Sequence, residues 1–124
     1  MGMESIAKIG FGVIILDSYK KGPWIDEFGE GDEYIPIFEW IASKGLDMKN
    51  FDICSAGREY GTNECSHLFY TPASVDGFQY WTEFDIQEIA AKEEEARQAF
   101  AKLFTGNEEY IEQGPNWILS HRIG

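Results

Sequence analysis

The most constraining feature of the sequence is the apolar run Ala7–Leu16, AKIGFGVIIL. From Ile9 to Ile15 every second residue is β-branched or aromatic, and a period of two is the period of a β-strand. The last four residues of the run are all apolar, as in a strand that is covered on both faces. Gly10 and Gly12 fall on one face, where a helix or an aromatic ring can approach closely. The run is therefore predicted to be a central strand of a sheet.

The rest of the chain carries two helix patterns and several short strand patterns. A helix is predicted over residues 34–44, with Pro36 in its first turn and Gly45 after its end. A second helix is predicted to begin after Asp85, whose side chain suits the N-cap position, and to end at Gly106. Strands are predicted over residues 51–56, 67–70 and 117–123. Residues 73–77 are expected to form a loop. Residues 78–84 fit either a fifth strand or a lead-in to the second helix.

These elements occur in the order strand, helix, strand, strand, helix, strand. The sequence therefore predicts an α+β fold, with a four- or five-stranded, mostly antiparallel sheet and two helices on one face, in the ferredoxin-like β-α-β-β-α-β order. The chain has 124 residues, of which 44% are hydrophobic, so residues 1–124 are expected to form a single domain with a sizeable core.

The charge of the chain restricts its partners. It has 22 acidic and 10 basic residues, a formal net charge of -12. Such a charge repels nucleic acid and anionic membranes and attracts basic surfaces, although acidity also serves to keep a small protein soluble. The sequence has no apolar run near the ~20 residues of a membrane-spanning helix, and no basic segment precedes its first apolar run. A cytoplasmic location without direct nucleic-acid or membrane binding is expected.

Residues 17–33 are predicted to form a long acidic loop that acts in recognition and is partly mobile when the protein is unbound. Trp24 and Phe28 are expected to hold this loop at one or two points while its acidic tip stays exposed. The candidate binding residues are Trp24, Asp26, Glu27, Phe28, Glu30, Asp32 and Glu33.

The loop does not match a calcium-binding EF-hand. Counting from Asp26, the third position is Phe28 and the twelfth is Ile37, where oxygen ligands are required. No metal site or cofactor is therefore assigned to it.

The cysteines and histidines of the chain match no known site by their spacing. Cys54, Cys65, His67 and His121 form no Cys-x-x-Cys pair and no zinc module, and no family signature surrounds either cysteine. In a reducing cytoplasm both cysteines are expected to be thiols. No catalytic residue is assigned, although a Cys–His nucleophile remains an alternative.

Three segments resemble a family of proteins. The segments Lys8–Ile14 (KIGFGVI) and Pro23–Glu27 (PWIDE) resemble the start of small uncharacterised bacteriophage and prophage accessory proteins, and Pro115–Ser120 (PNWILS) resembles their closing strand. The resemblance implies a small protein made in the cytoplasm of an infected bacterium that acts by binding a host or phage protein.

The main hypothesis is a non-enzymatic binding protein that docks on a basic protein surface, for example one that normally holds nucleic acid. The acidic loop and Glu93–Glu95 would steer the encounter, and Trp24, Phe28, Trp81 or Tyr110 would anchor it, unless these aromatic residues pack in the core. The alternatives are a small enzyme or ligand-binding protein with a Cys/His/acid cleft at the sheet edge, and a homodimeric structural protein.

Overall fold

The computed structural model describes residues 7–16, 21–29, 34–58, 64–77 and 83–121. In this part of the chain the strands are β1 (Ala7–Leu16), β2 (Phe51–Arg58), β3 (Glu64–Gly77) and β4 (Ile111–His121). They form one sheet in the order β2-β3-β1-β4, and all neighbouring pairs are antiparallel. The prediction that Ala7–Leu16 is a central strand is confirmed.

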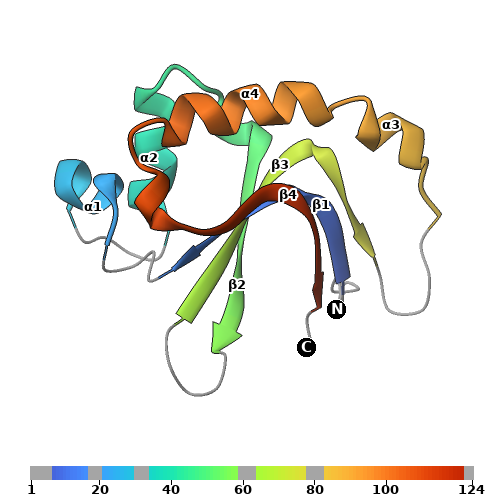
Figure 1. Cartoon of the computed structure of the whole chain (residues 1–124), viewed down its shortest axis with the longest axis horizontal. Helices are drawn as coiled ribbons and strands as arrows, with labels where there is room; N and C mark the ends of the chain where they lie inside the picture. The colour runs from blue at the N-terminus through green and yellow to red at the C-terminus, as the bar shows by residue number, and fades with distance from the viewer. Residues whose placement is uncertain (1–6, 17–20, 30–33, 59–63, 78–82, 122–124) are drawn as a thin grey trace.

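The helices are α1 (Pro23–Phe28), α2 (Ile35–Ser43), α3 (Ile86–Ala90) and α4 (Glu93–Phe104), with short 3₁₀ helices η1 (Met48–Asn50) and η2 (Glu108–Tyr110). Figure 1 shows α2 and α4 together over one side of the curved sheet. Trp40 of α2 contacts Phe104 of α4, with 5.4 Å between the ring centroids. The α+β class and the ferredoxin-like order of elements are therefore confirmed.

Four local predictions differ from the structure. The predicted loop at 17–33 contains α1, and the predicted loop at 73–77 is the last part of β3. Strand β4 begins at Ile111 instead of 117. The predicted second helix is two helices joined by a turn, because α3 packs on β3 while α4 packs on both β1 and β3. Asp85 is confirmed as an N-cap, since its side chain accepts a hydrogen bond from the Gln87 N–H at 2.9 Å.

A shift in register explains how β3 continues past its proline. Gly10 of β1 pairs with Ser74, whereas Gly12 pairs with Phe69. Residues 70–73 lie between these two partners, whereas only Phe11 lies between the two glycines, so β3 has extra residues here and forms a bulge. Pro72 is tolerated in the bulge because no ladder hydrogen bond is required from its nitrogen.

The core lies between the sheet and the helices. Alternate residues of β1 enter it, and the ring of Phe11 packs against Phe100 of α4 and Trp117 of β4. The side chains that fill this space include Phe11, Val13, Ile15, Trp40, Phe51, Leu68, Phe100 and Leu103. The prediction that helices cover one face of the central strand is confirmed.

The opposite face of the sheet carries a buried lysine. Lys8 is 7% exposed, and its Nζ lies 2.8 Å from Oδ2 of Asp52 and 3.3 Å from Oδ1 of Asp76. The same ammonium group lies 5.4 Å from the centroid of the Phe69 ring. These contacts connect β1 to both β2 and β3 on the face away from the helices.

The stability of the protein is expected to fall at alkaline pH. Burial lowers the pKa of Lys8, but the hydrogen bond and charge of Asp52, with Asp76, outweigh burial and raise this pKa above 10.5. Burial and the bond to Glu95 raise the pKa of the Tyr70 hydroxyl to about 12. Both groups have a higher pKa in the folded than in the unfolded state. Their contributions to the free energy of unfolding are therefore complete below about pH 10 and are lost as the pH rises through the folded-state pKa values.

Urea unfolding at a series of pH values measures this loss. We expect Lys8→Met to cost about 1 kcal/mol at neutral pH, because Asp52 and Asp76 are half-exposed and regain water. The variant should also show a shallower fall in the free energy of unfolding above pH ~10. An alkaline slope equal to that of the parent would contradict this role of Lys8.

Candidate protein-binding surface

Trp24 packs helix α1 against the body of the protein. Pro23 occupies its first turn, and the helix ends where the Gly29 N–H donates to the Ile25 carbonyl at 2.8 Å. Trp24 is 0% exposed, and its ring lies 5.1 Å from that of Trp40 and 6.0 Å from that of Tyr110. Trp24 therefore joins α1 to α2 and η2.

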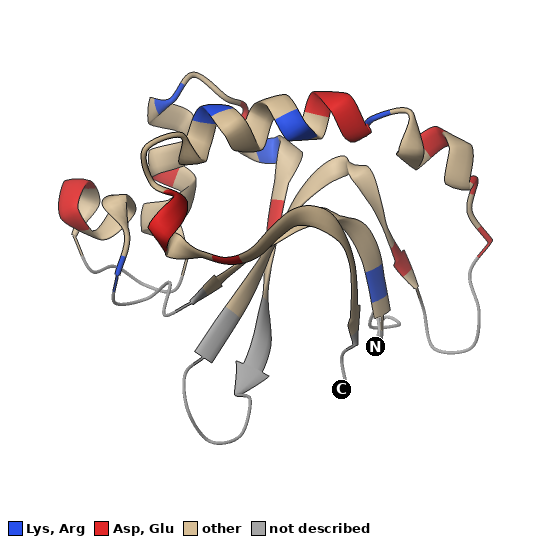
Figure 2. Cartoon of the chain, in the orientation of Figure 1, with Lys and Arg blue, Asp and Glu red and all other residues tan. Residues whose placement is uncertain are grey.

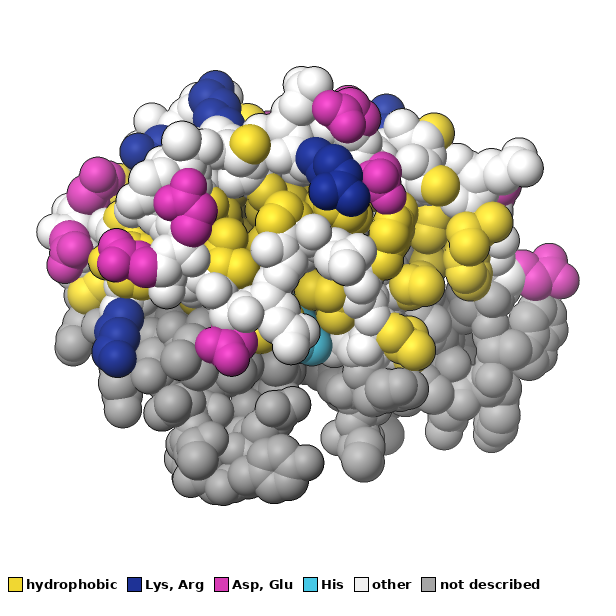
Figure 3. Space-filling view, viewed as in Figure 1, with side chains coloured by type: hydrophobic (Ala, Val, Ile, Leu, Met, Phe, Trp, Pro, Cys, Tyr) yellow, Lys and Arg dark blue, Asp and Glu magenta, His cyan; other side chains and the backbone are white. Residues whose placement is uncertain are grey.

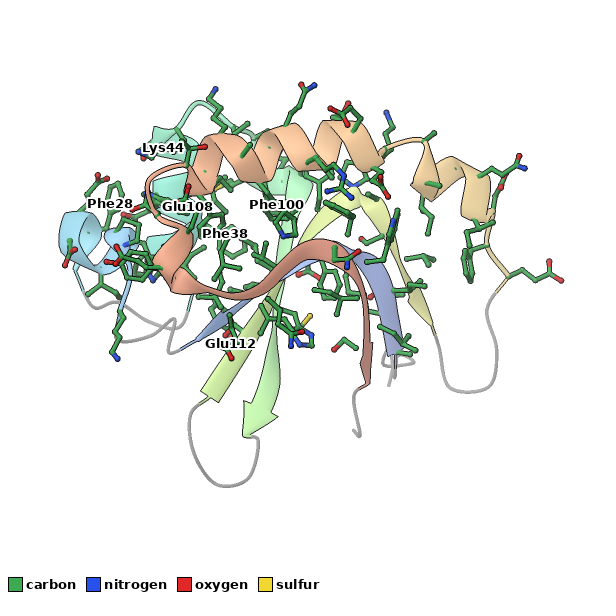
Figure 4. The ribbon with its side chains drawn as sticks, viewed as in Figure 1. Phe28, Phe38, Lys44, Phe100, Glu108 and Glu112 are labelled. Atoms are coloured by element: carbon green, nitrogen blue, oxygen red, sulfur yellow. The ribbon has the colours of Figure 1, made fainter. Side chains whose placement is uncertain are left out.

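The burial of Trp24 decides between the two roles expected for it, holding the loop and contacting a partner. As a core residue it holds the acidic segment in place and offers no surface to a partner. Asp26 and Glu27 are exposed, as predicted, and Phe28 is 39% exposed (Figure 4). The other candidate residues, Glu30, Asp32 and Glu33, lie outside the described residues.

Two further acidic residues lie near α1. Glu108 and Glu109 are exposed on η2, and the contact between Trp24 and Tyr110 places η2 beside α1. Figure 2 shows the acidic residues of both elements at the same end of the molecule. We call Asp26, Glu27, Glu108 and Glu109 the acidic end. The sequence shows that Glu108 and Glu109 are adjacent to an apolar anchor, but only the tertiary contact brings them to α1.

Glu108 is held in its charged form by the backbone. Its carboxylate accepts a hydrogen bond from the Gly106 N–H at 3.1 Å. Hydrogen bonds from its own N–H and from that of Gly106 lower the pKa of this carboxyl group. The acidic end therefore keeps its charge below neutral pH at this position.

The acidic stretch at the start of α4 has mainly internal partners. Glu93 accepts a hydrogen bond from the Trp117 indole at 2.5 Å and lies 3.4 Å from Nε of Arg97. Glu95 accepts from the Tyr70 hydroxyl at 2.6 Å. These carboxylates hold α4 on the sheet, so they are poorly suited to the steering role expected for Glu93–Glu95. Among the expected aromatic anchors, Tyr110 is half-buried against Trp24, and Trp81 lies outside the described residues.

One pair of the cysteine and histidine residues comes together. Cys54 of β2 is the register partner of His67 of β3, and Asp52 lies on the same face, away from the helices. The His67 ring packs edge-on against Phe69, with 5.8 Å between the centroids. The side chains of Cys65 and His121 lie outside the described residues. In the part of the chain that is described, no three His, Cys, Asp or Glu side chains are grouped to hold a metal ion.

The described helices are all too short or too polar to cross a membrane. Comparison with known proteins finds no family model, no curated protein and no solved structure that matches this chain.

Proposed function

We propose that this protein is a non-enzymatic binding protein whose acidic end docks on a basic surface of another protein. The observation that carries the proposal is the exposure of Phe28 and of four carboxylates on two elements that the buried Trp24 holds together. A fixed group of like charges attracts a basic surface over a distance, and an exposed aromatic ring supplies apolar contact once the surfaces meet.

The net charge of -12 supports the same proposal. It raises the rate of encounter with basic surfaces and disfavours acidic ones, including nucleic acid itself. The resemblance of three segments to phage accessory proteins suggests where the partner is found. We therefore propose a host or phage protein in the bacterial cytoplasm, with a basic surface of the kind that holds nucleic acid.

Capture of partners from a bacterial lysate tests this proposal. The immobilised protein is expected to retain a basic partner at about 50 mM salt and to release it at about 500 mM, because salt screens exposed charges. The variant Asp26→Asn, Glu27→Gln, Glu109→Gln should fold with unchanged or slightly higher stability, since it relieves like-charge repulsion of about 1 kcal/mol or less per close pair. It should associate with the captured partner more slowly and with a weaker dependence on salt.

A matched variant separates the effect of the acidic end on binding from the effect of the overall net charge. Glu83→Gln, Glu88→Gln, Glu94→Gln removes the same number of charges from exposed positions on or near α3 and α4. It should bind the same partner nearly as fast as the parent. Equal loss in both variants would show that only net charge matters, and no retained partner at low salt would overturn the proposal.

A further inference from the structure

A groove lies between the C-terminal half of α4 and the first residues of β4. It encloses about 520 Å³, and hydrophobic side chains are visible within it in Figure 3. The register between β1 and β4 shifts on both sides of Ile14, and Gly114 has a φ of +102°. Such a shift bends a strand locally, which explains why β4 leaves a hollow here instead of packing flat below α4.

The lining of the groove combines aliphatic and acidic groups. Ala101 on α4 and Ile111 and Pro115 on β4 form its aliphatic part, and Glu108 and Glu112 are its acidic residues. In Figure 4, Glu108 lies beside the end of α4 that is nearer to α1, whereas Glu112 lies on the other side of the β4 ribbon. Below them, Phe100 and Phe104 are only 1% and 2% exposed. The groove therefore offers little aromatic surface, and a purely apolar ligand would gain little by entering it.

Arg97, the one arginine among the described residues that line the groove, is already balanced by its own neighbours. Nε of Arg97 lies 3.4 Å from Oε2 of Glu93, and its guanidinium carbon lies 4.8 Å from the centroid of the Phe11 ring. Its positive charge is therefore directed at α4 and the sheet. With Glu108 and Glu112 against Arg97, the described lining of the groove has a net negative character.

We propose that this groove binds a lysine or arginine side chain from an extended basic segment of the partner. The long aliphatic stem of such a side chain suits the aliphatic lining, and its cationic head suits the carboxylate of Glu108, while Glu112 adds a second negative charge to the lining. Because Glu108 belongs both to the groove and to the acidic end, one segment would contact both. The inference rests on the proposed function, since it names the part of the partner that the acidic end attracts.

A short peptide in which lysine alternates with alanine is a suitable probe. Its affinity, measured by fluorescence anisotropy at low salt, should fall about fivefold for each charge removed in Glu108→Gln, Glu112→Gln. Ala101→Trp should weaken binding several-fold by filling the groove without changing the charge. The matched controls are Glu83→Gln, Glu88→Gln for charge and Gln98→Trp for bulk on the exposed side of α4; both should bind as the parent does.

The outcomes separate this inference from the proposed function. If Ala101→Trp binds the peptide as tightly as Gln98→Trp, the groove is not the binding site. If only Asp26→Asn, Glu27→Gln, Glu109→Gln loses the peptide, the acidic end binds basic surfaces without the groove, and the proposed function stands. If the parent protein does not bind the peptide, the inference is overturned, and capture from the lysate decides the proposed function independently.

Discussion

Gly12→Ala is expected to lower the free energy of unfolding by about 3 kcal/mol or more. A Cβ atom at this position would lie 2.2 Å from the Leu68 carbonyl oxygen and 3.1 Å from Cα of Phe69. Both atoms belong to the backbone of β3, which cannot move aside without breaking its pairing with β1. Because β1 also pairs with β4, a shift of β1 would disturb two ladders at once.

Gly77→Ala is the matched control for this substitution. It lies in the same pair of strands, but its Cβ would lie 3.6 Å from the nearest atoms of Ala7, an ordinary contact. We expect a change within about 0.5 kcal/mol. Urea unfolding of both variants measures the difference, and equal stability of the two would show that β3 yields more easily than its contacts suggest.

Most of the fold follows from patterns that are local in the sequence. The alternation in Ala7–Leu16 identifies β1, and its pair of glycines predicts the close approach of an aromatic ring, which Phe69 makes at Gly10. The apolar period and the Asp85 cap identify the region of α3 and α4. The turn between these two helices carries no such signal, because it reflects their packing on different parts of the sheet.

The other differences also depend on contacts that a local pattern does not contain. Helix α1 is only six residues long, too short to show a helical period, and is held by Trp24. Pro72 normally ends a strand, but the shift in register provides a bulge that accommodates it. Gly114 and Pro115 interrupt the alternation of apolar and polar residues in β4, so the first half of this strand cannot be recognised from the sequence pattern.

The candidate site was partly accessible to sequence reasoning. The exposure of Asp26 and Glu27 follows from their charge, since isolated carboxylates are rarely buried. The contribution of Glu108 and Glu109 depends on a contact between residues 24 and 110, which no local pattern indicates. The sequence also does not show that Trp24 is buried while Phe28 is exposed, because an aromatic residue in an acidic segment suits a core and an interface equally.

Trp24→Ala is expected to cost about 3–5 kcal/mol of stability, the range for removing a large aromatic side chain from a core. The ring is fully buried between Trp40 and Tyr110, and Gly22 packs directly against it. Its loss leaves a cavity where α1, α2 and η2 meet. Thermal and urea unfolding measure the cost, and the variant should also lose the fixed arrangement of the acidic end before the whole protein unfolds.

Phe28→Ala distinguishes packing from binding on the same helix. Phe28 is 39% exposed, so its truncation should cost about 1 kcal/mol or less, while the rate at which a captured partner dissociates should rise. Trp24 acts through the fold and Phe28 through contact, so Trp24→Ala should reduce both stability and binding, whereas Phe28→Ala should reduce binding with little effect on stability. A stable Trp24→Ala variant that loses its partner would instead make Trp24 a contact residue, as the sequence first suggested.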